Sequence, residues 1–283
     1  MIGETFALLT ALTWAASTVL SAEALKRVDP IRSNTIKTFF AALVMLPIAF
    51  AAGEFNNLFH ADLEALLFVV SAAIIGFGIG DTLLFKSIVI IGVSRAYTIA
   101  YTYPLFTMII AVLLLKEPFL LRYLIGTILT VLSIIMISSE NNKTHGSISL
   151  KGLMMALAAA LTWAIGTILV ALGLKNISVF LANALRYPAL FLFLYLISKP
   201  RKKWMLDKKD LAVLSASGIL GMVLGGITFL FSVQLIGASR ATPLSASSPV
   251  WASIMSSVAL KEKITLRLLL SSIIVVIGVY FLI

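Results

Sequence analysis

Apolar runs of about 20 residues, separated by short polar connectors, occupy almost the whole of this 283-residue chain. A transmembrane helix needs ~20 mostly apolar residues, whereas a strand of a membrane barrel alternates over ~10 residues. Inside lipid, every backbone polar group must find its partner locally, and a helix satisfies that condition within one segment. The runs here are continuous rather than alternating, so the sequence predicts an all-α integral membrane protein.

The composition supports the same class. Hydrophobic residues make up 60% of the chain and charged residues 12%, about half of the ~25% that is usual in soluble domains. A soluble fold could not cover so much apolar surface with so few polar side chains. We therefore expect a multi-pass protein of the cell membrane, with the lipid bilayer as its main partner.

Hydropathy along the chain predicts about ten transmembrane helices. The expected spans are residues 4–24, 33–53, 65–87, 95–115, 120–138, 152–172, 179–198, 211–235, 240–260 and 264–283. The longest polar connectors are Gly53–Glu64, Ser138–Lys151 and Lys199–Asp210, and each is too short for a soluble domain. Any binding or chemistry must therefore take place inside the helix bundle.

Several kinds of site are missing from the sequence. The chain has no cysteine, and its two histidines, His60 and His145, fall in connectors, so we expect neither a metal site nor a cofactor. The net charge of +10 comes mostly from basic residues between the spans, so it does not indicate a nucleic-acid partner. The glycine-rich run Gly76–Gly80 lacks the preceding strand of a nucleotide-binding loop. Its Gly-x-x-x-Gly spacing, repeated in Gly221–Gly225, instead indicates close contact between helices.

An internal repeat divides the chain into two halves. Ala11–Ala15, which reads Ala-Leu-Thr-Trp-Ala, returns as Ala160–Ala164, 149 residues later. The same offset pairs Leu25 with Leu174, Lys26 with Lys175, Asn34 with Asn183, and Lys37 with Arg186. After a loss of four residues the offset is 145, which pairs Gly76 with Gly221, Gly80 with Gly225, Gly92–Ala96 with Gly237–Ala241, Pro104 with Pro249, Leu115–Glu117 with Leu260–Glu262, and Arg122 with Arg267. Chance does not explain Trp, Arg, Pro and Glu matching in one order with a single gap.

The odd number of spans in the repeat determines how its second copy inserts into the membrane. A unit of five spans enters the membrane on one side and leaves on the other, so its duplicate inserts upside down. We therefore predict two inverted five-helix repeats, residues 1–142 and 143–283. Inverted repeats are the architecture of alternating access, with the substrate held near the membrane midplane between the halves. The sequence thus favours a secondary transporter.

The chain resembles the drug/metabolite transporter superfamily, and in particular its ten-helix EamA branch. The resemblance rests on the two Ala-Leu-Thr-Trp openings, the basic residue early in spans two and seven, the two Gly-x-Ser-Arg-Ala turns, and proline followed by Leu-Lys-Glu. It covers essentially the whole chain, and it implies a central cavity and export of a small polar or amphipathic metabolite. The related small multidrug resistance proteins carry a glutamate in the middle of their first helix. No carboxylate lies there in spans one and six, so their proton-for-cation exchange is not expected.

Two basic residues inside the spans are candidates for the substrate cavity. Lys37 and Arg186 are equivalent in the repeat, and each lies one to two turns inside its span. A charge at a helix centre costs about 2.5–3.5 kcal/mol on insertion scales, so such residues are functional candidates. They would attract an anionic or zwitterionic substrate. Alternatively, each long side chain extends to the interface and leaves its charge in water.

Asp81 is the candidate for proton coupling. It lies within span three, and its repeat partner is Gly226. A carboxyl group at that depth can take up and release protons, which makes protons a candidate coupling ion. Alternatively, Asp81 forms a structural ion pair with Lys86, although five positions along a helix is not a favoured spacing for contact.

Spans four and nine are the predicted cavity walls. Tyr97, Tyr101 and Pro104 recur at helical spacing and would share one face. Proline removes a helix hydrogen bond, so Pro104 and Pro249 would break the helices and allow gating. The second half supplies hydroxyl groups where the first has aromatic rings, at Thr242, Ser245 and Ser248. The alternative is that the tyrosines are ordinary packing residues.

Trp14 and Trp163 complete the predicted cavity. Both lie near the middle of their spans, where an interfacial role does not explain them. An indole N–H at that depth requires an acceptor, either on a neighbouring helix or on a substrate.

The sequence fits two other classes of protein less well, a membrane-embedded enzyme and a non-transporting structural bundle. A membrane-embedded enzyme would need a nucleophile with a base, or a metal cluster, at membrane depth, and the spans contain neither pattern. A non-transporting structural bundle would not need inverted repeats. The sequence leaves open the substrate, the direction and the oligomeric state.

The orientation in the membrane is also left open. Fifteen of the 22 Lys and Arg residues fall in odd-numbered connectors, four in even-numbered connectors and three inside spans. The positive-inside rule then places both termini outside the cytoplasm. The resemblance implies the opposite orientation, with both termini inside.

Overall fold

The computed structural model describes residues 1–25, 27–140, 149–198, 207–259 and 265–283. His145 and the segment Leu260–Glu262, which the repeat pairs with Leu115–Glu117, lie outside the described residues. Many of the basic residues in the charge count, including Lys202 and Lys203, also lie outside them.

The described part of the chain is helical throughout. The first half contains α1 (Ile2–Leu25), α2 (Pro30–Ala51), α3 (Glu54–Leu58), α4 (Leu63–Ala72), η1 (Ala73–Gly80), α5 (Asp81–Ile91), α6 (Val93–Ala100), α7 (Tyr103–Ile110), η2 (Ala111–Leu115) and α8 (Leu121–Glu140). The second half contains α9 (Leu150–Gly173), α10 (Val179–Ile197), α11 (Lys208–Gly218), η3 (Ile219–Leu224), α12 (Gly225–Ile236), α13 (Ala238–Ala246), α14 (Ser248–Ala259) and α15 (Leu266–Leu282).

These elements form ten consecutive segments in the described residues, as the hydropathy predicts. Seven of the segments are long and apolar enough to cross a membrane. Leu121–Met136 and Leu266–Leu282 are shorter apolar helices. The remaining segment, α13 followed by α14, is divided by a turn at Ser247. Many large apolar side chains of the bundle are exposed, as expected where a surface faces lipid.

Equivalent positions in the two halves begin equivalent helices. The Asp29 carboxylate caps α2 by accepting hydrogen bonds from the N–H groups of Ile31 at 3.0 Å and Arg32 at 3.2 Å. Ser178, 149 residues later, caps α10 by accepting from the N–H of Leu181 at 3.1 Å. The repeat is therefore visible in local structure as well as in sequence.

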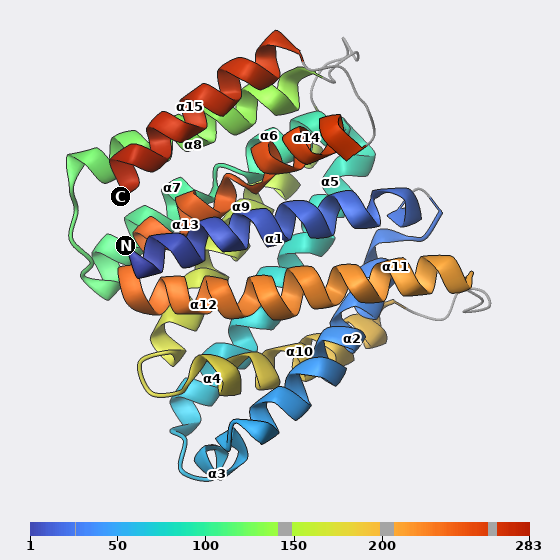
Figure 1. The fold of residues 1–283 in the computed structure, drawn as a ribbon, viewed down its shortest axis with the longest axis vertical. Coiled ribbons are helices and arrows are strands. Elements are labelled where there is room, and N and C mark those ends of the chain that lie inside the picture. Colours follow the sequence, from blue (N-terminus) through green and yellow to red (C-terminus); the bar gives the residue numbers. More distant parts are fainter. Residues whose placement is uncertain (26, 141–148, 199–206, 260–264) are drawn as a thin grey trace.

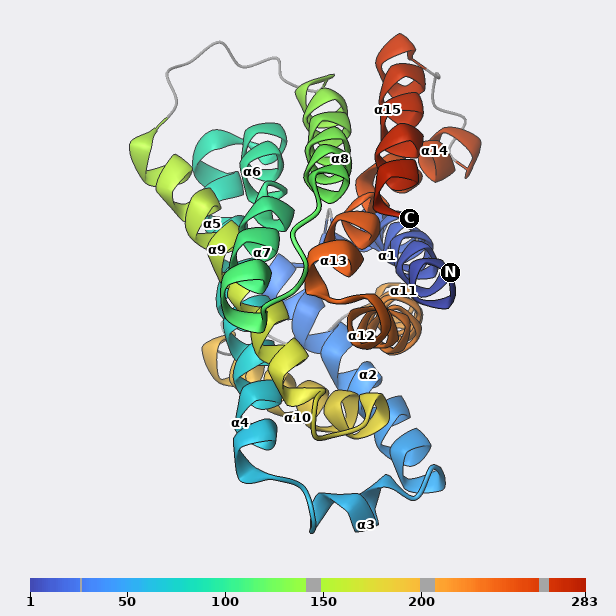
Figure 2. The ribbon, with the colours of Figure 1, turned by 90° about the vertical axis from the view of Figure 1, so that its left-hand side faces the viewer.

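The two halves pack on each other reciprocally. α1 lies against the continuous run α11–η3–α12 of the second half, and α9 lies against the run α4–η1–α5 of the first. α2 pairs with its equivalent α10, and α8 pairs with its equivalent α15. α1 and α9 cross the molecule in opposite directions, and both termini lie at the same side (Figure 1). Figure 2 shows the α8–α15 pair at the end of the molecule opposite to α3.

The helices break near the two predicted prolines rather than bending at them. α6 ends at Ala100 and α7 begins at Tyr103, so Pro104 stands in the first turn of α7. In the second half, α14 starts at Ser248 and Pro249 is its second residue. Proline is favoured in a first helical turn because its missing N–H would have no partner there. The sequence predicts helix breaks at Pro104 and Pro249, and in the structure a turn between two helices lies just before each of these prolines.

Glycine allows the close approach of the halves. The indole of Trp14 lies on Gly225 and that of Trp163 lies on Gly80, so a Cβ at either glycine would lie 2.7 Å from the indole Cδ1. Both glycines adjoin π-helical turns, η3 and η1, at equivalent places in the third span of each half. Such turns widen a helix and are frequent at functional sites.

We expect Gly225→Ala to lower the thermal unfolding temperature of the detergent-purified protein, by overpacking that costs about 1–3 kcal/mol. Gly76→Ala is the matched control, because its added Cβ would meet its nearest neighbour, Gly166 Cα, at 3.6 Å. The control should unfold at or above the wild-type temperature. Equal unfolding temperatures for the two variants would contradict the tight Trp–Gly contact.

Candidate functional site: a charged cavity between the halves

One cavity lies where the two halves meet. Its volume is about 250 Å³, and α1, α2, η1, α9, α10 and η3 all contribute to its wall. Ligand pockets usually measure ~300–1,000 Å³, so this one suits a small molecule. The predicted site residues that line it are Trp14, Lys37, Asp81, Tyr101, Trp163, Arg186 and Ser248.

The two tryptophans occupy equivalent places and bind different acceptors. The Trp14 Nε1–H donates to the carbonyl oxygen of Gly221 at 3.1 Å. The Trp163 Nε1–H donates to Asp81 Oδ1 at 2.9 Å. Each indole therefore joins the first helix of one half to the third span of the other. The difference between a carbonyl and a carboxylate acceptor is the first sign that the cavity is chemically asymmetric.

Asp81 is held by neutral donors and faces a cation. Besides the Trp163 indole, Asn34 Nδ2 donates to Asp81 Oδ2 at 3.2 Å. The positive charge of Lys37 acts on the same carboxylate. Lys86, the alternative partner considered from the sequence, is exposed, and Asp81 makes its hydrogen bonds with Asn34 and Trp163 instead.

Arg186 is enclosed by protein. The residue is 4% exposed, and its guanidinium lies 5.3 Å from the ring centroid of Phe77. Nη1 donates to Asn183 Oδ1 at 3.4 Å, while Nε is buried and has no hydrogen-bond partner in the described part of the chain. Because the side chain faces the cavity rather than the protein surface, these contacts favour the functional interpretation over extension to the interface.

Aromatic rings form the wall beside Asp81. Tyr101 lies in the turn between α6 and α7, and its ring centroid is 5.8 Å from that of Trp163. The ring of Tyr103 is 5.4 Å from the same indole. Ser248, at the start of α14, lines the cavity from the equivalent break in the second half. The turns at the two equivalent helix breaks therefore both lie beside the cavity.

Five candidates lie outside the lining, and one of them, Thr242, is fully buried. The Tyr97 ring is 5.6 Å from that of Tyr101 and stands behind it. Ser245 is fully buried, and its hydroxyl donates to the carbonyl oxygen of Ala7 at 3.3 Å, so it joins α13 to α1. Pro104 and Pro249 start helices and do not face the cavity.

Several residues that line the cavity were not among the predicted site residues. These are Ser17, Thr18, Asn34, Phe77, Tyr103, Thr167, Tyr187, Met222 and Phe229. Repeat identity could have found some of them. Thr18 and Thr167 are equivalent, and each lies one helical turn beyond a predicted tryptophan.

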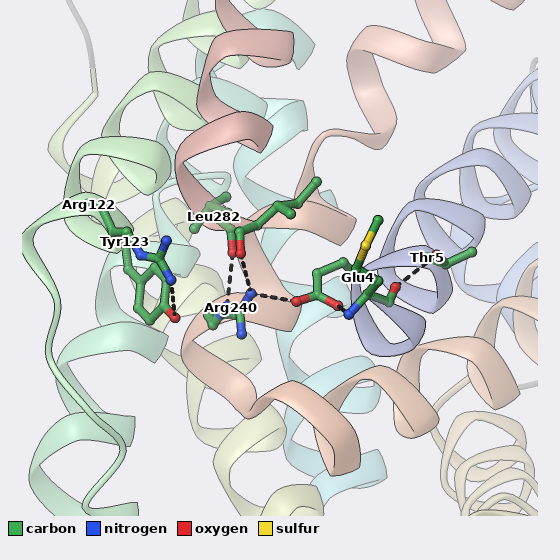
Figure 3. A network of polar contacts seen from close by, with 8 residues as sticks. Glu4, Thr5, Arg122, Tyr123, Arg240 and Leu282 are labelled. Carbon is green, nitrogen blue, oxygen red and sulfur yellow. Dashed lines mark hydrogen bonds and ion pairs between the residues drawn. The ribbon is translucent and has the colours of Figure 1, made fainter.

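A second polar cluster lies at the termini, away from the cavity lining (Figure 3). Arg240 Nη2 contacts Glu4 Oε1 at 2.6 Å and the carbonyl oxygen of Ile283 at 3.1 Å. Arg240 also lies over the ring of Tyr123, at 4.9 Å from its centroid. The cluster joins α13 to the start of α1, the end of α15 and the start of α8, which is a structural role.

The ten-segment bundle, the reciprocal halves and the buried charged cavity define a membrane transporter fold. The model of the EamA-like transporter family matches residues 1–139 and again residues 150–283, so the chain belongs to that family. The chain is accordingly an integral membrane transporter of a small molecule, and the family is not one of enzymes.

One curated transporter and one solved structure are similar to this chain along nearly its whole length. An uncharacterized transporter from Archaeoglobus fulgidus is 28% identical over 283 residues, which is all of this chain and 98% of the relative. A solved crystal structure matches 99% of this chain and 95% of its own chain with a TM-score of 0.83. At 16% identity, that second match shows the fold alone.

Replacing either cavity tryptophan by phenylalanine tests the asymmetry. Trp163→Phe keeps an aromatic ring but removes a donor from a partly buried carboxylate, so we expect a loss of about 1.5–3 kcal/mol in stability. Trp14→Phe removes a bond to a neutral carbonyl and should cost about 0.5–1.5 kcal/mol. Thermal unfolding in detergent measures both variants. Equal losses would show that Asp81 does not depend on the indole.

Proposed function

We propose that this protein is a secondary transporter that exports a small polar or amphipathic metabolite by alternating access. The observation that carries the proposal is the position of the cavity. Its wall contains repeat-equivalent residues of both halves, such as Trp14 with Trp163 and Lys37 with Arg186. Export is the direction that the resemblance to the drug/metabolite transporters implies.

Alternating access follows from the reciprocal packing. The first helix of each half lies on the third span of the other, so relative movement of the halves changes the access of both faces together. Because the halves are inverted, a movement that closes the cavity at one side opens it at the other. We take residues 1–142 and 143–283 as the two moving units.

We further propose that Asp81 carries the coupling proton. It is the one carboxylate in the described lining of the cavity. An ionised Asp81 attracts Lys37 and accepts bonds from Asn34 and Trp163. Protonation would remove the negative charge and weaken the bond to Trp163, which joins the two halves, and this links proton binding to the conformational change.

Proteoliposomes containing an entrapped pH-sensitive dye test this function. Gradients of amino acids, monocarboxylates, amines and sugar phosphates would be imposed in turn. We expect at least one solute gradient to drive proton movement through the wild-type protein. Asp81→Asn should abolish that proton movement and retain solute binding, because the amide keeps the shape of the side chain without its ionisation.

Asp62→Asn is the matched control, since Asp62 is an exposed residue that caps α4 outside the cavity, and asparagine is an equally good cap. This variant should behave as the wild type does. Unchanged proton movement in Asp81→Asn would remove Asp81 from the mechanism. Failure of every solute class to move through the wild-type protein would contradict secondary transport.

A further inference from the structure

The second half repeats the charged corner of the first half but lacks its acid. In the first half, Asn34 and Lys37 on α2 face Asp81 on α5. Asn183 and Arg186 are their equivalents on α10, at an offset of 149. The equivalent of Asp81, however, is Gly226. The second half therefore keeps the cation and has no side chain where the first half has a carboxylate.

Among the residues that the structure describes, no other acid takes that place. The contacts of Arg186 in the described residues are the long bond to Asn183 Oδ1 and the face of the Phe77 ring, and its Nε has no partner. A guanidinium stays charged in a protein, and a buried charge is costly unless it is paired. The residue is therefore a buried, unpaired cation whose side chain lines the cavity.

A tyrosine excludes a side chain from position 226. Tyr187, which stands where the first half has Thr38, donates its hydroxyl hydrogen to the carbonyl oxygen of Met222. A Cβ added to Gly226 would clash with the Tyr187 hydroxyl. The pair Asp81 and Thr38 in one half is thus replaced by the pair Gly226 and Tyr187 in the other.

We infer that Arg186 binds the carboxylate of the substrate, and that the substrate is a monocarboxylate with an apolar body of about one ring. This inference rests on the proposed function of the cavity. Arg186 lines the cavity, and the planar fork of N–H donors on a guanidinium matches the geometry of a carboxylate. Trp14, Phe77 and Phe229, which also line the cavity, form an apolar surface for the body of the molecule.

The charge of the cavity separates this class from related ones. When Asp81 is ionised, the described lining holds two cations, Lys37 and Arg186, and one carboxylate, which leaves one positive charge. A monocarboxylate cancels that charge. A zwitterion leaves it unbalanced, a cationic amine adds to it, and a dianionic phosphate reverses it.

Four probes that share one aromatic ring test the inference on the purified full-length protein. They are phenylacetate, 2-phenylethylammonium, phenylalanine and phenyl phosphate, compared by thermal shift and by calorimetric titration. We expect phenylacetate to bind most tightly. Arg186→Gln should weaken its binding by roughly 30-fold or more, since a buried charge loses its partner. Tightest binding of any other probe, no binding of phenylacetate, or unchanged affinity in Arg186→Gln overturns the inference.

A second pair of variants tests whether the missing acid at position 226 leaves Arg186 free for the substrate, even if Arg186→Gln does not fold. Tyr187→Thr combined with Gly226→Asp recreates the pattern of the first half and gives Arg186 an internal acid. Tyr187→Thr combined with Gly226→Asn is the matched control, with the same shape and no charge. We expect the aspartate version to lose phenylacetate binding and the asparagine version to keep it. Equal affinities in the two versions overturn the inference.

The same probes distinguish the two proposals. If proteoliposomes carry the amine or the phosphate but not phenylacetate, the transport function stands and the substrate class is wrong. If phenylacetate binds through Arg186 and no probe crosses the membrane, the binding site stands and the transport function fails.

Discussion

The packing of the two halves depends on two equivalent contacts. In each, a tryptophan of the cavity wall lies on a glycine in the third span of the opposite half. Trp14 on Gly225 and Trp163 on Gly80 bring helices from the two halves close enough for indole and glycine to touch. The absence of side chains at these glycines makes room for the indoles, and the indole N–H groups then reach acceptors on the same spans. Close approach through small residues is the usual means of helix association in lipid, where no hydrophobic effect drives helices together. Both indoles also line the cavity, which therefore lies beside these two contacts.

The same repeat that gives a symmetric scaffold carries an asymmetric set of charges. One corner has an acid, an amide and a lysine, and the other has an amide and an arginine. Burying charged groups in a membrane protein lowers its stability, so the presence of these side chains indicates a functional role rather than a packing role. The acid-containing corner provides a place for a coupling proton, and the acid-free corner provides a place for a substrate anion. Because proton binding and substrate binding would then occupy equivalent corners of the two halves, one movement of the halves would act on both sites.

The sequence predicts the fold to within a few residues at most boundaries, because hydropathy over ~20 residues reports membrane spans directly. The mid-span position of the two tryptophans and the repeat equivalence of Lys37 with Arg186 predicted a role in the cavity, and all four residues line the cavity described above. The periodicity of span four, in contrast, placed Tyr97 beside Tyr101 in the wall. The helix breaks before Pro104, and this turn brings Tyr101 to the cavity while Tyr97 remains behind it. The exchange of Asp81 with Thr38 for Gly226 with Tyr187 depends on contacts between helices, which no pattern within one span reveals.

The central claim is that the cavity opens to each side of the membrane in turn, and the accessibility of a single cysteine tests it most directly. The natural chain has no cysteine, so Thr18→Cys or its equivalent Thr167→Cys gives one reactive thiol in the cavity wall. A membrane-impermeant maleimide would be applied to one face of oriented vesicles and then, in a separate sample, to the other. The account predicts that each cysteine reacts from both faces, and that a bound substrate or an imposed pH gradient changes the ratio of the two rates. Labelling from one face alone under every condition would contradict it.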